Sequence, residues 1–249
     1  MTMSLDLTGR SAIVCGSSSG MGLAIAEAFI DAGANVAMFA RRRDVLEREA
    51  ERLGALAVRG DVTLPGDLER LVTRTVEAFG GIDILVNNGG GPPGGPAADL
   101  TDDALESAVS LLLLSAVRLT NLCLPELERS GRGRIVNIES SSVREPIDGL
   151  ALSNAVRPGV VGWAKTLARE VGPRGITVNT IAPGRIDTER LRDLYDGPVP
   201  EAELERIPLR RLGSAQEIAS VVCFLASDAA SYVTGAVIPV DGGLTRSLL

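Results

Sequence analysis

The fold of this chain is decided by one segment, Ser11-Ala12-Ile13-Val14-Cys15-Gly16-Ser17-Ser18-Ser19-Gly20-Met21-Gly22. Its first five residues form a short and mostly apolar run, as expected of a buried strand. Three glycines follow, separated by three residues and then by one, and apolar residues at helical spacing come after them. The segment therefore predicts a strand, a tight glycine turn and a helix.

The glycine turn is suited to bind a phosphate. Glycines let backbone N–H groups approach a ligand closely, and the helix that follows points its free N–H groups and the positive end of its dipole back at the turn. A purely structural turn would use the same glycines, but the strand, the glycines and the helix occur together as a dinucleotide-binding fingerprint requires. The cofactor-binding residues predicted in this turn are Gly16, Ser18, Ser19, Gly20 and Met21.

Length and composition fit one α/β domain. Of the 249 residues, 45% are hydrophobic and only 3% are aromatic, so aliphatic side chains must fill the interior. There is no linker, repeat or second domain, and we expect residues 1–249 to form a single domain. The net charge of −7 argues against nucleic acid as a partner. The N-terminal segment lacks the features of a signal peptide and no uninterrupted apolar run reaches membrane-spanning length, so we expect a cytoplasmic protein without a membrane partner.

The chain contains no histidine, which excludes several classes of chemistry. Without histidine, Ser-His-Asp hydrolysis, Cys-His catalysis and most zinc catalysis have no basis. The three cysteines, Cys15, Cys123 and Cys223, are far apart and set in apolar stretches. We therefore expect reduced core cysteines and no metal site.

Strands and helices alternate along the whole chain. Apolar runs predict seven strands, while helical periodicity, glycines and a capping box predict the helices between them. Repeated strand–helix units imply a parallel sheet with helices on both faces, and right-handed crossovers give the doubly wound Rossmann arrangement. The predicted strands are 11–15, 36–40, 55–59, 82–86, 133–138, 176–181 and 236–240, and the predicted helices after the first are 44–53, 65–79, 102–129, 152–171 and 214–226.

The glycine turn resembles the T-G-x-x-x-G-x-G turn of the short-chain dehydrogenase/reductase family, with Cys15 in place of the threonine. The resemblance covers nearly the whole chain. Asn87-Asn88-Gly89 is similar to the family's N-N-A-G motif, and Pro183–Thr188 is similar to its P-G-x-I-x-T motif. The resemblance implies that a dinucleotide is bound by Asp61 and Val62 at the adenine, by Asn88 and Gly89 along its length, by Ile186 at the nicotinamide amide, by Thr188 at the phosphates, and by Pro183 and Gly184 beside them.

The end of the second strand decides between NAD and NADP, because it meets the adenosine ribose. An acidic residue there would bind the 2′-hydroxyl and repel a 2′-phosphate, but this chain has Ala40 at that position and Arg41 after it. A guanidinium without a neighbouring carboxylate favours a phosphate. We therefore predict NADP(H), although a run of arginines such as Arg41–Arg43 is also a common start of a solvated surface helix.

The family's catalytic tetrad of Asn, Ser, Tyr and Lys is largely replaced in this chain. The resemblance keeps the serine as Ser140, puts Ser153 at the tyrosine position and Arg157 at the lysine position, and puts Leu112 at the asparagine position. A serine hydroxyl is a far weaker acid than a phenol, and arginine does not deprotonate, so this set lacks an ordinary proton donor. Tyr195 lies in the variable segment that covers the substrate in the family, and it either enters the site or lies on the loop surface. The catalytic candidates are Ser140, Ser153, Arg157 and Tyr195.

These features predict an NADP(H)-dependent oxidoreductase with a divergent tetrad that acts on a small-molecule carbonyl or alcohol, in a subgroup resembling 3-oxoacyl-carrier-protein reductases. Intact cofactor motifs beside a degraded tetrad also fit a pseudoenzyme that binds NADP(H) as a sensor or assembly partner, and a non-redox lyase or isomerase is a third interpretation. The two long predicted helices have outward faces rich in Leu, Val and Ala, and in the family these helices pair across a two-fold axis. We therefore also expect a homotetramer or a dimer.

Overall fold

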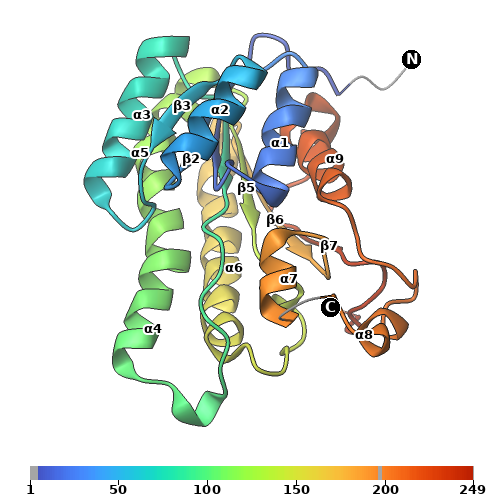
Figure 1. Ribbon diagram of the computed structural model, residues 1–249. Coiled ribbons are helices and arrows are strands. Elements are labelled where there is room, and N and C mark those ends of the chain that lie inside the picture. Colours follow the sequence, from blue (N-terminus) through green and yellow to red (C-terminus); the bar gives the residue numbers. More distant parts are fainter. Residues whose placement is uncertain (1–4, 196–197, 249) are drawn as a thin grey trace.

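The computed structural model describes residues 5–195 and 198–248, so the domain predicted for 1–249 extends beyond them at residues 1–4, 196–197 and 249. Seven strands form one sheet in the order β3-β2-β1-β4-β5-β6-β7, and every neighbouring pair is parallel. The doubly wound parallel sheet predicted from the sequence is therefore confirmed (Figure 1). The strands are β1 (Ser11–Cys15), β2 (Asn35–Ala40), β3 (Leu56–Arg59), β4 (Ile84–Asn87), β5 (Arg134–Ile138), β6 (Thr177–Pro183) and β7 (Val237–Val240).

Helices cover both faces of the sheet and make three layers (Figure 1). Strands β1, β4 and β5 are buried throughout, which explains why they read as mostly apolar runs in the sequence. One face of the sheet packs against α1 (Gly20–Asp31), α2 (Arg43–Leu53) and α9 (Ala215–Ala226), and the other packs against α3 (Pro65–Phe79), α5 (Ser115–Ser130) and α6 (Ala151–Val171).

Several helix ends lie where the sequence predicts them. Pro65 is the first residue of α3, and the helix ends at Gly80, whose φ of 82° is in the left-handed region that glycine adopts freely. Before α9, the hydroxyl of Ser214 accepts a hydrogen bond from the backbone N–H of Glu217 at 3.2 Å, while the Glu217 carboxylate accepts one from the backbone N–H of Ser214 at 2.8 Å. The predicted capping box is therefore confirmed.

The helix predicted over 102–129 contains a π turn that the sequence does not predict. It consists of α4 (Asp102–Val109), the π turn Ser110–Leu114, and α5. The wide turn packs closely against the segment that follows β4: a Cβ added to Gly89 would lie only 2.8 Å from the carbonyl oxygen of Leu111. Single π turns of this kind are frequent at functional sites.

The combined helix Asp102–Ser130 is, in length and composition alone, long and apolar enough to cross a membrane. Its inward residues Leu119, Cys123 and Leu127 are buried in the core cluster beneath the sheet. The α4 end packs against α6 instead, through Ala108 and Leu112. Buried residues make up 39% of its most apolar stretch, and helices of a protein core pass the same test of length and composition.

Two short helices occupy the segment after Thr188 that the sequence analysis treats as a loop. They are α7 (Glu189–Tyr195) and α8 (Glu201–Glu205), which lie near the carboxyl end of the sheet (Figure 1). Tyr195 is therefore the last residue of a helix and not a loop residue. Their charged, short sequences carry too little apolar periodicity to be recognised without the sheet against which they fold.

Candidate cofactor and active site

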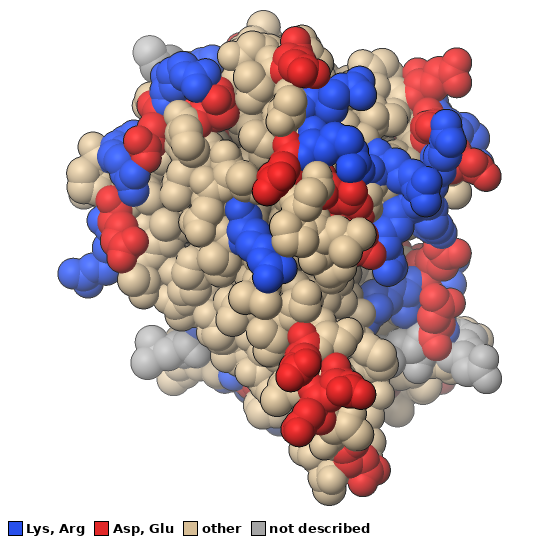
Figure 2. Space-filling model, turned by 90° about the vertical axis from the view of Figure 1, so that its left-hand side faces the viewer, with Lys and Arg blue, Asp and Glu red and all other residues tan. Residues whose placement is uncertain are grey.

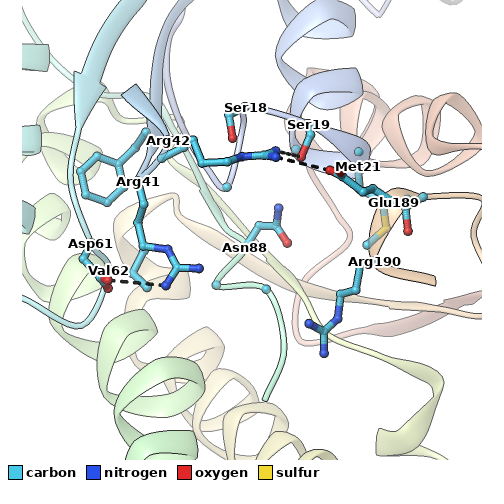
Figure 3. A pocket seen from close by; sticks show the side chains of 18 of the residues that line it. Ser18, Ser19, Met21, Arg41, Arg42, Asp61, Val62, Asn88, Glu189 and Arg190 are labelled. Atoms are coloured by element: carbon cyan, nitrogen blue, oxygen red, sulfur yellow. Dashed lines mark hydrogen bonds and ion pairs between the residues drawn. The ribbon is translucent and has the colours of Figure 1, made fainter. Parts of the chain in front are cut away.

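The carboxyl ends of β1 to β4 open into a cleft of about 350 Å³ (Figure 3). Ligands bind at this edge of parallel sheets because helix N-termini and loop backbone groups gather there. Most of the cofactor-binding residues predicted from the sequence line this cleft, namely Gly16, Ser18, Ser19, Gly20, Met21, Arg41, Asp61, Val62, Asn88, Gly89 and Thr188.

The glycine turn brings the backbone close to the space where a phosphate would lie. Gly16 and Gly20 have φ values of 61° and 56°, which glycine alone adopts without strain. Gly22 is needed for a different reason. A Cβ at this position would overlap the carbonyl oxygen of Gly16 and would lie 2.9 Å from the Asn88 side-chain nitrogen. No side chain caps α1 at Ser19, so the first N–H groups of the helix remain available to an anion.

Two arginines follow β2 at the rim of the cleft, and only one of them was expected there. Arg41 is largely exposed, with its Nη1 atom 3.8 Å from Oδ2 of Asp61. Arg42 also lines the cleft, which the sequence analysis did not predict. Its guanidinium donates a hydrogen bond of 2.7 Å to the Ser19 hydroxyl and lies 3.4 Å from the carboxylate of Glu189 (Figure 3). The run of three arginines was the available signal, but it does not tell which guanidinium turns inward.

A second pocket of about 150 Å³ adjoins the cleft at the carboxyl ends of β5 and β6. It contains the remaining predicted cofactor-binding residues together with three of the catalytic candidates. Met21, Asn88, Thr188 and Arg190 line both spaces, so the two are continuous. The predicted residues in this second pocket are Pro183, Gly184, Ile186, Ser140, Ser153 and Arg157.

Arg157 is the centre of a buried polar network beside this pocket. Its guanidinium donates three hydrogen bonds, to the Ser153 hydroxyl at 3.0 Å, to the Glu139 carboxylate at 2.9 Å and to the carbonyl oxygen of Gly90 at 2.6 Å. The Ser153 hydroxyl also lies 3.1 Å from the hydroxyl of Ser142. Helix α6 holds Ser153 and Arg157 four residues apart on one face, and it continues unbroken through Pro158, which lies on its exposed side.

Glu139 is a functional candidate that the sequence analysis did not find. It follows directly after β5, and its side chain is only 5% exposed. Burial raises the pKa of the Glu139 carboxyl from 4.5 to about 7, while the charge and hydrogen bond of Arg157 act in the opposite direction. The available signal was an acidic residue at the carboxyl end of an apolar central strand, which is where sites form in parallel sheets.

Arg190, at the start of α7, is a second functional candidate that the sequence analysis did not find. It lines both the cleft and the second pocket, and it donates a hydrogen bond of 2.9 Å to the carbonyl oxygen of Pro92. Its guanidinium packs against Gly91 so closely that a Cβ there would overlap it. Burial, together with the neighbouring charge of Arg157, lowers the pKa of Arg190. Its charge is therefore held between the two spaces.

Tyr195 is not brought into this pocket. Its hydroxyl donates a hydrogen bond of 3.3 Å to the Glu203 carboxylate, and burial raises its pKa. Leu112, by contrast, lies close behind the polar network, where it lines a small internal cavity together with Glu139 and Arg157. The structure therefore groups Ser140, Ser153 and Arg157 and leaves Tyr195 apart from them.

Comparisons with known proteins agree with this architecture. A family model described as enoyl-(acyl carrier protein) reductase matches residues 16–245. The chain is 38% identical over 242 residues to 3-oxoacyl-(acyl-carrier-protein) reductase FabG of Salmonella typhimurium, covering 96% of this chain and 99% of that one. It is 35% identical over 255 residues to dehydrogenase/reductase SDR family member 4 of Homo sapiens, covering 100% and 92%.

Two solved structures are similar to nearly the whole chain. L-sorbose reductase from Gluconobacter frateurii, complexed with NADPH and L-sorbose, superposes with a TM-score of 0.93 at 32% identity, covering 99% of this chain and 100% of that one. An NADPH-bound short chain oxidoreductase from Pseudomonas aeruginosa PAO1, reported to contain an atypical catalytic center, gives a TM-score of 0.92 at 33% identity, covering 97% and 99%. Since the family model and the relatives extend along almost the entire chain, this protein belongs to the short-chain dehydrogenase/reductase family.

Proposed function

We propose that this protein is an NADP(H)-dependent oxidoreductase that interconverts a small-molecule carbonyl and the corresponding alcohol. The observation that carries the proposal is the continuity of the glycine-turn cleft with the pocket that holds Ser140, Ser153 and Arg157. NADPH occupies the L-sorbose reductase and the Pseudomonas aeruginosa oxidoreductase, whose folds superpose on this one. A reductase needs the reacting end of its cofactor beside its substrate, and two continuous spaces meet that need.

The residues of the cleft fit NADP(H). The glycine turn and the N-terminus of α1 suit the pyrophosphate, since no side chain caps the first N–H groups of this helix. Arg41 and Arg42 are the cations available to a 2′-phosphate, and Ala40 offers no charge to repel it. Asp61 and Val62 line the same cleft for the adenine. When bound, the cofactor supplies or accepts the hydride.

The catalytic set departs from the family tetrad in this proposal. Ser153 takes the tyrosine position, Arg157 the lysine position and Leu112 the asparagine position. The hydroxyls of Ser140 and Ser153 line the pocket and can hydrogen-bond a substrate oxygen. Arg157 donates a hydrogen bond that fixes the orientation of the Ser153 hydroxyl. An atypical catalytic center in the Pseudomonas aeruginosa relative supports the idea that NADPH binding and an altered tetrad coexist.

Oxidation of NADPH, followed by its absorbance at about 340 nm, tests this function directly. We expect slow reduction of simple ketones and diketones, far below the roughly 10 per second that is typical of enzymes, because the tyrosine acid is replaced. NADPH binding without oxidation by any carbonyl in a broad panel, and without NADP reduction by the matching alcohols, would favour the pseudoenzyme. Conversion of a substrate with no change in the cofactor would favour the lyase or isomerase.

The cofactor preference should depend on the guanidinium of Arg41. A charge-assisted hydrogen bond contributes about 1.5–3 kcal/mol. Arg41→Ala should therefore reduce the preference for NADPH over NADH by about 10- to 100-fold, measured as a ratio of dissociation constants by fluorescence titration. Arg48→Ala is the matched control, since Arg48 is exposed on α2 and pairs with Glu49 outside the cleft. Equal affinities of the unmodified protein for the two cofactors would contradict the prediction.

The expected homotetramer or dimer remains a prediction. Figure 2 shows a broad area with few charged side chains on the side of the molecule that carries α4 and α5. Leu105 on α4 and Leu114 in the π turn between these helices are exposed, which is typical of a surface that a second subunit covers. Light scattering at micromolar concentration should give the mass of at least a dimer, and the mass of a monomer would contradict this.

A further inference from the structure

The described residues that line the pocket proposed to bind substrate include neither the tyrosine nor the lysine of the family tetrad. Among the described residues that line it there is no tyrosine, histidine, cysteine or lysine. Its ionisable side chains are three arginines, Arg157, Arg185 and Arg190, and one carboxyl group, that of Glu139. Arginine does not release its proton in proteins. Glu139 is thus the one lining side chain that can give up a proton and take it back.

We propose that Glu139 is the general acid and base of this enzyme, donating a proton to the substrate oxygen during reduction and removing it during oxidation. The proposal rests on the oxidoreductase function argued above and adds to it the residue that replaces the family tyrosine.

The position of Glu139 suits this role. It follows the carboxyl end of β5 and, like Ser140, is one of the residues that line the pocket. One carboxylate oxygen accepts the hydrogen bond from Arg157. Glu139 also borders the small cavity behind the pocket, beside Leu112. Arg157 therefore fixes the side chain of a residue that lines both the pocket and the cavity behind it.

The charges around Glu139 keep both of its protonation states accessible. Burial disfavours the carboxylate, whereas the guanidinium of Arg157 stabilises it, and the pKa of about 7 is the balance of the two. Arg157 is the charged group that acts on Glu139 within the described part of the chain. Arg190 and Arg157 repel each other. A general acid is most effective when its pKa is near the working pH, and that condition is met here.

The carbonyl carbon of the substrate would gain a hydride with its electron pair from bound NADPH, which becomes NADP⁺, while the π pair of the C=O bond moves onto the oxygen. A new O–H bond forms on that oxygen as the O–H bond of the Glu139 carboxyl breaks. Glu139 is left as a carboxylate beside Arg157, and a proton taken up from the bulk solvent restores the acid. The Ser153 hydroxyl, held by Arg157, is placed to orient the substrate oxygen.

Replacing Glu139 with glutamine removes the acid and retains a polar group of the same shape. The matched control is Glu77→Gln, an identical change on the exposed side of α3. The conservative variant is Glu139→Asp, which keeps a carboxyl group. NADPH binding by each variant, measured by fluorescence, shows that the variant is folded.

The first readout needs no turnover. In protein labelled with ¹³C at glutamate side-chain carboxyls, NMR should show one carboxyl signal that titrates near pH 7 and disappears in Glu139→Gln but not in Glu77→Gln. A Glu139 signal that titrates in the ordinary glutamate range, near ~4.3, would overturn the proposal.

The second readout is the pH dependence of kcat/KM for NADPH oxidation with a small α-diketone such as diacetyl. The value should be level below about pH 7 and fall about tenfold per pH unit above it, because reduction needs the protonated acid. Glu139→Gln should lower the rate by about 10²–10⁴-fold and abolish this fall, whereas Glu139→Asp should retain it. A rate in Glu139→Gln within threefold of the unmodified protein would overturn the role of Glu139. If none of the carbonyl compounds tested led the unmodified protein to oxidise NADPH, the oxidoreductase function would be overturned instead, and the role of Glu139 as proton donor with it.

Discussion

Replacing Arg157 with methionine should lower the free energy of unfolding by about 3–5 kcal/mol at about pH 8, which is the usual loss when one partner of a buried ion pair is removed. Methionine fills a similar volume but leaves the Glu139 carboxylate buried without a counter-charge, since both side chains are less than 10% exposed. It also removes the hydrogen bonds to Gly90 and Ser153. Urea denaturation followed by circular dichroism measures this loss.

The loss should depend on pH in a defined direction. The pKa of Glu139 is higher in the folded protein, at about 7, than its ordinary value of 4.5. Its contribution to stability is therefore complete below the ordinary value and disappears as the pH rises through about 7. Without Arg157 the folded-state pKa rises further, so the gap between variant and unmodified protein should widen with pH. Near pH 5 the loss should shrink to about 1–2 kcal/mol, the contribution of the remaining hydrogen bonds.

The matched control for this prediction is Arg174→Met. Arg174 forms an exposed ion pair with Glu128, and such pairs contribute about 0–1 kcal/mol. We expect a small loss for this variant that does not change between the two pH values. A loss for Arg157→Met that is equally small, or independent of pH, would show that Glu139 and Arg157 do not form a buried pair.

Gly22→Ala should weaken NADPH binding by about 10- to 100-fold, since overpacking costs about 1–3 kcal/mol and each 1.4 kcal/mol is a factor of ten. The added methyl group would overlap the carbonyl oxygen of Gly16 and approach the Asn88 amide to 2.9 Å. The obstructing carbonyl belongs to the backbone, so the turn itself must move away from its phosphate-binding position. Fluorescence titration with NADPH measures the change.

Gly66→Ala separates this effect from a general effect of alanine. Gly66 lies in the first turn of α3, where an added Cβ would meet nothing within 4 Å. Alanine at an unstrained helical position stabilises a protein by about 0.4–1 kcal/mol, and NADPH binding should be unchanged. An affinity of Gly22→Ala equal to that of the unmodified protein would show that the glycine turn does not hold the cofactor.

The sequence by itself determined the parallel sheet and most of the cofactor cleft. In Ser11–Gly22 the apolar run, the glycines and the helical periodicity involve residues that are close together in the chain, so local rules identify them. Local rules also identify the proline that begins α3, the glycine that ends it, and the capping box of α9. Once strands and helices alternate, right-handed crossovers leave one arrangement that brings the strand ends to a common edge.

Only the tertiary structure decided how side chains meet at that edge. Arg42 and Ser19 are 23 residues apart, Arg190 and Pro92 are 98 apart, and Tyr195 turns to Glu203 and not to the pocket. The π turn beside Gly89 arises where one helix meets the end of β4. Each of these contacts depends on how an element packs against another, which spacing along the chain does not encode.

Glu139 illustrates the difference most clearly. In the sequence it is one acidic residue before a serine, and only its position at the end of a predicted strand separates it from a carboxylate on the surface. Its function in this fold comes from burial at the end of β5 and from a guanidinium that α6 delivers 18 residues later. Burial and a neighbouring charge set the pKa of a carboxyl group, and both are properties of the packed interior.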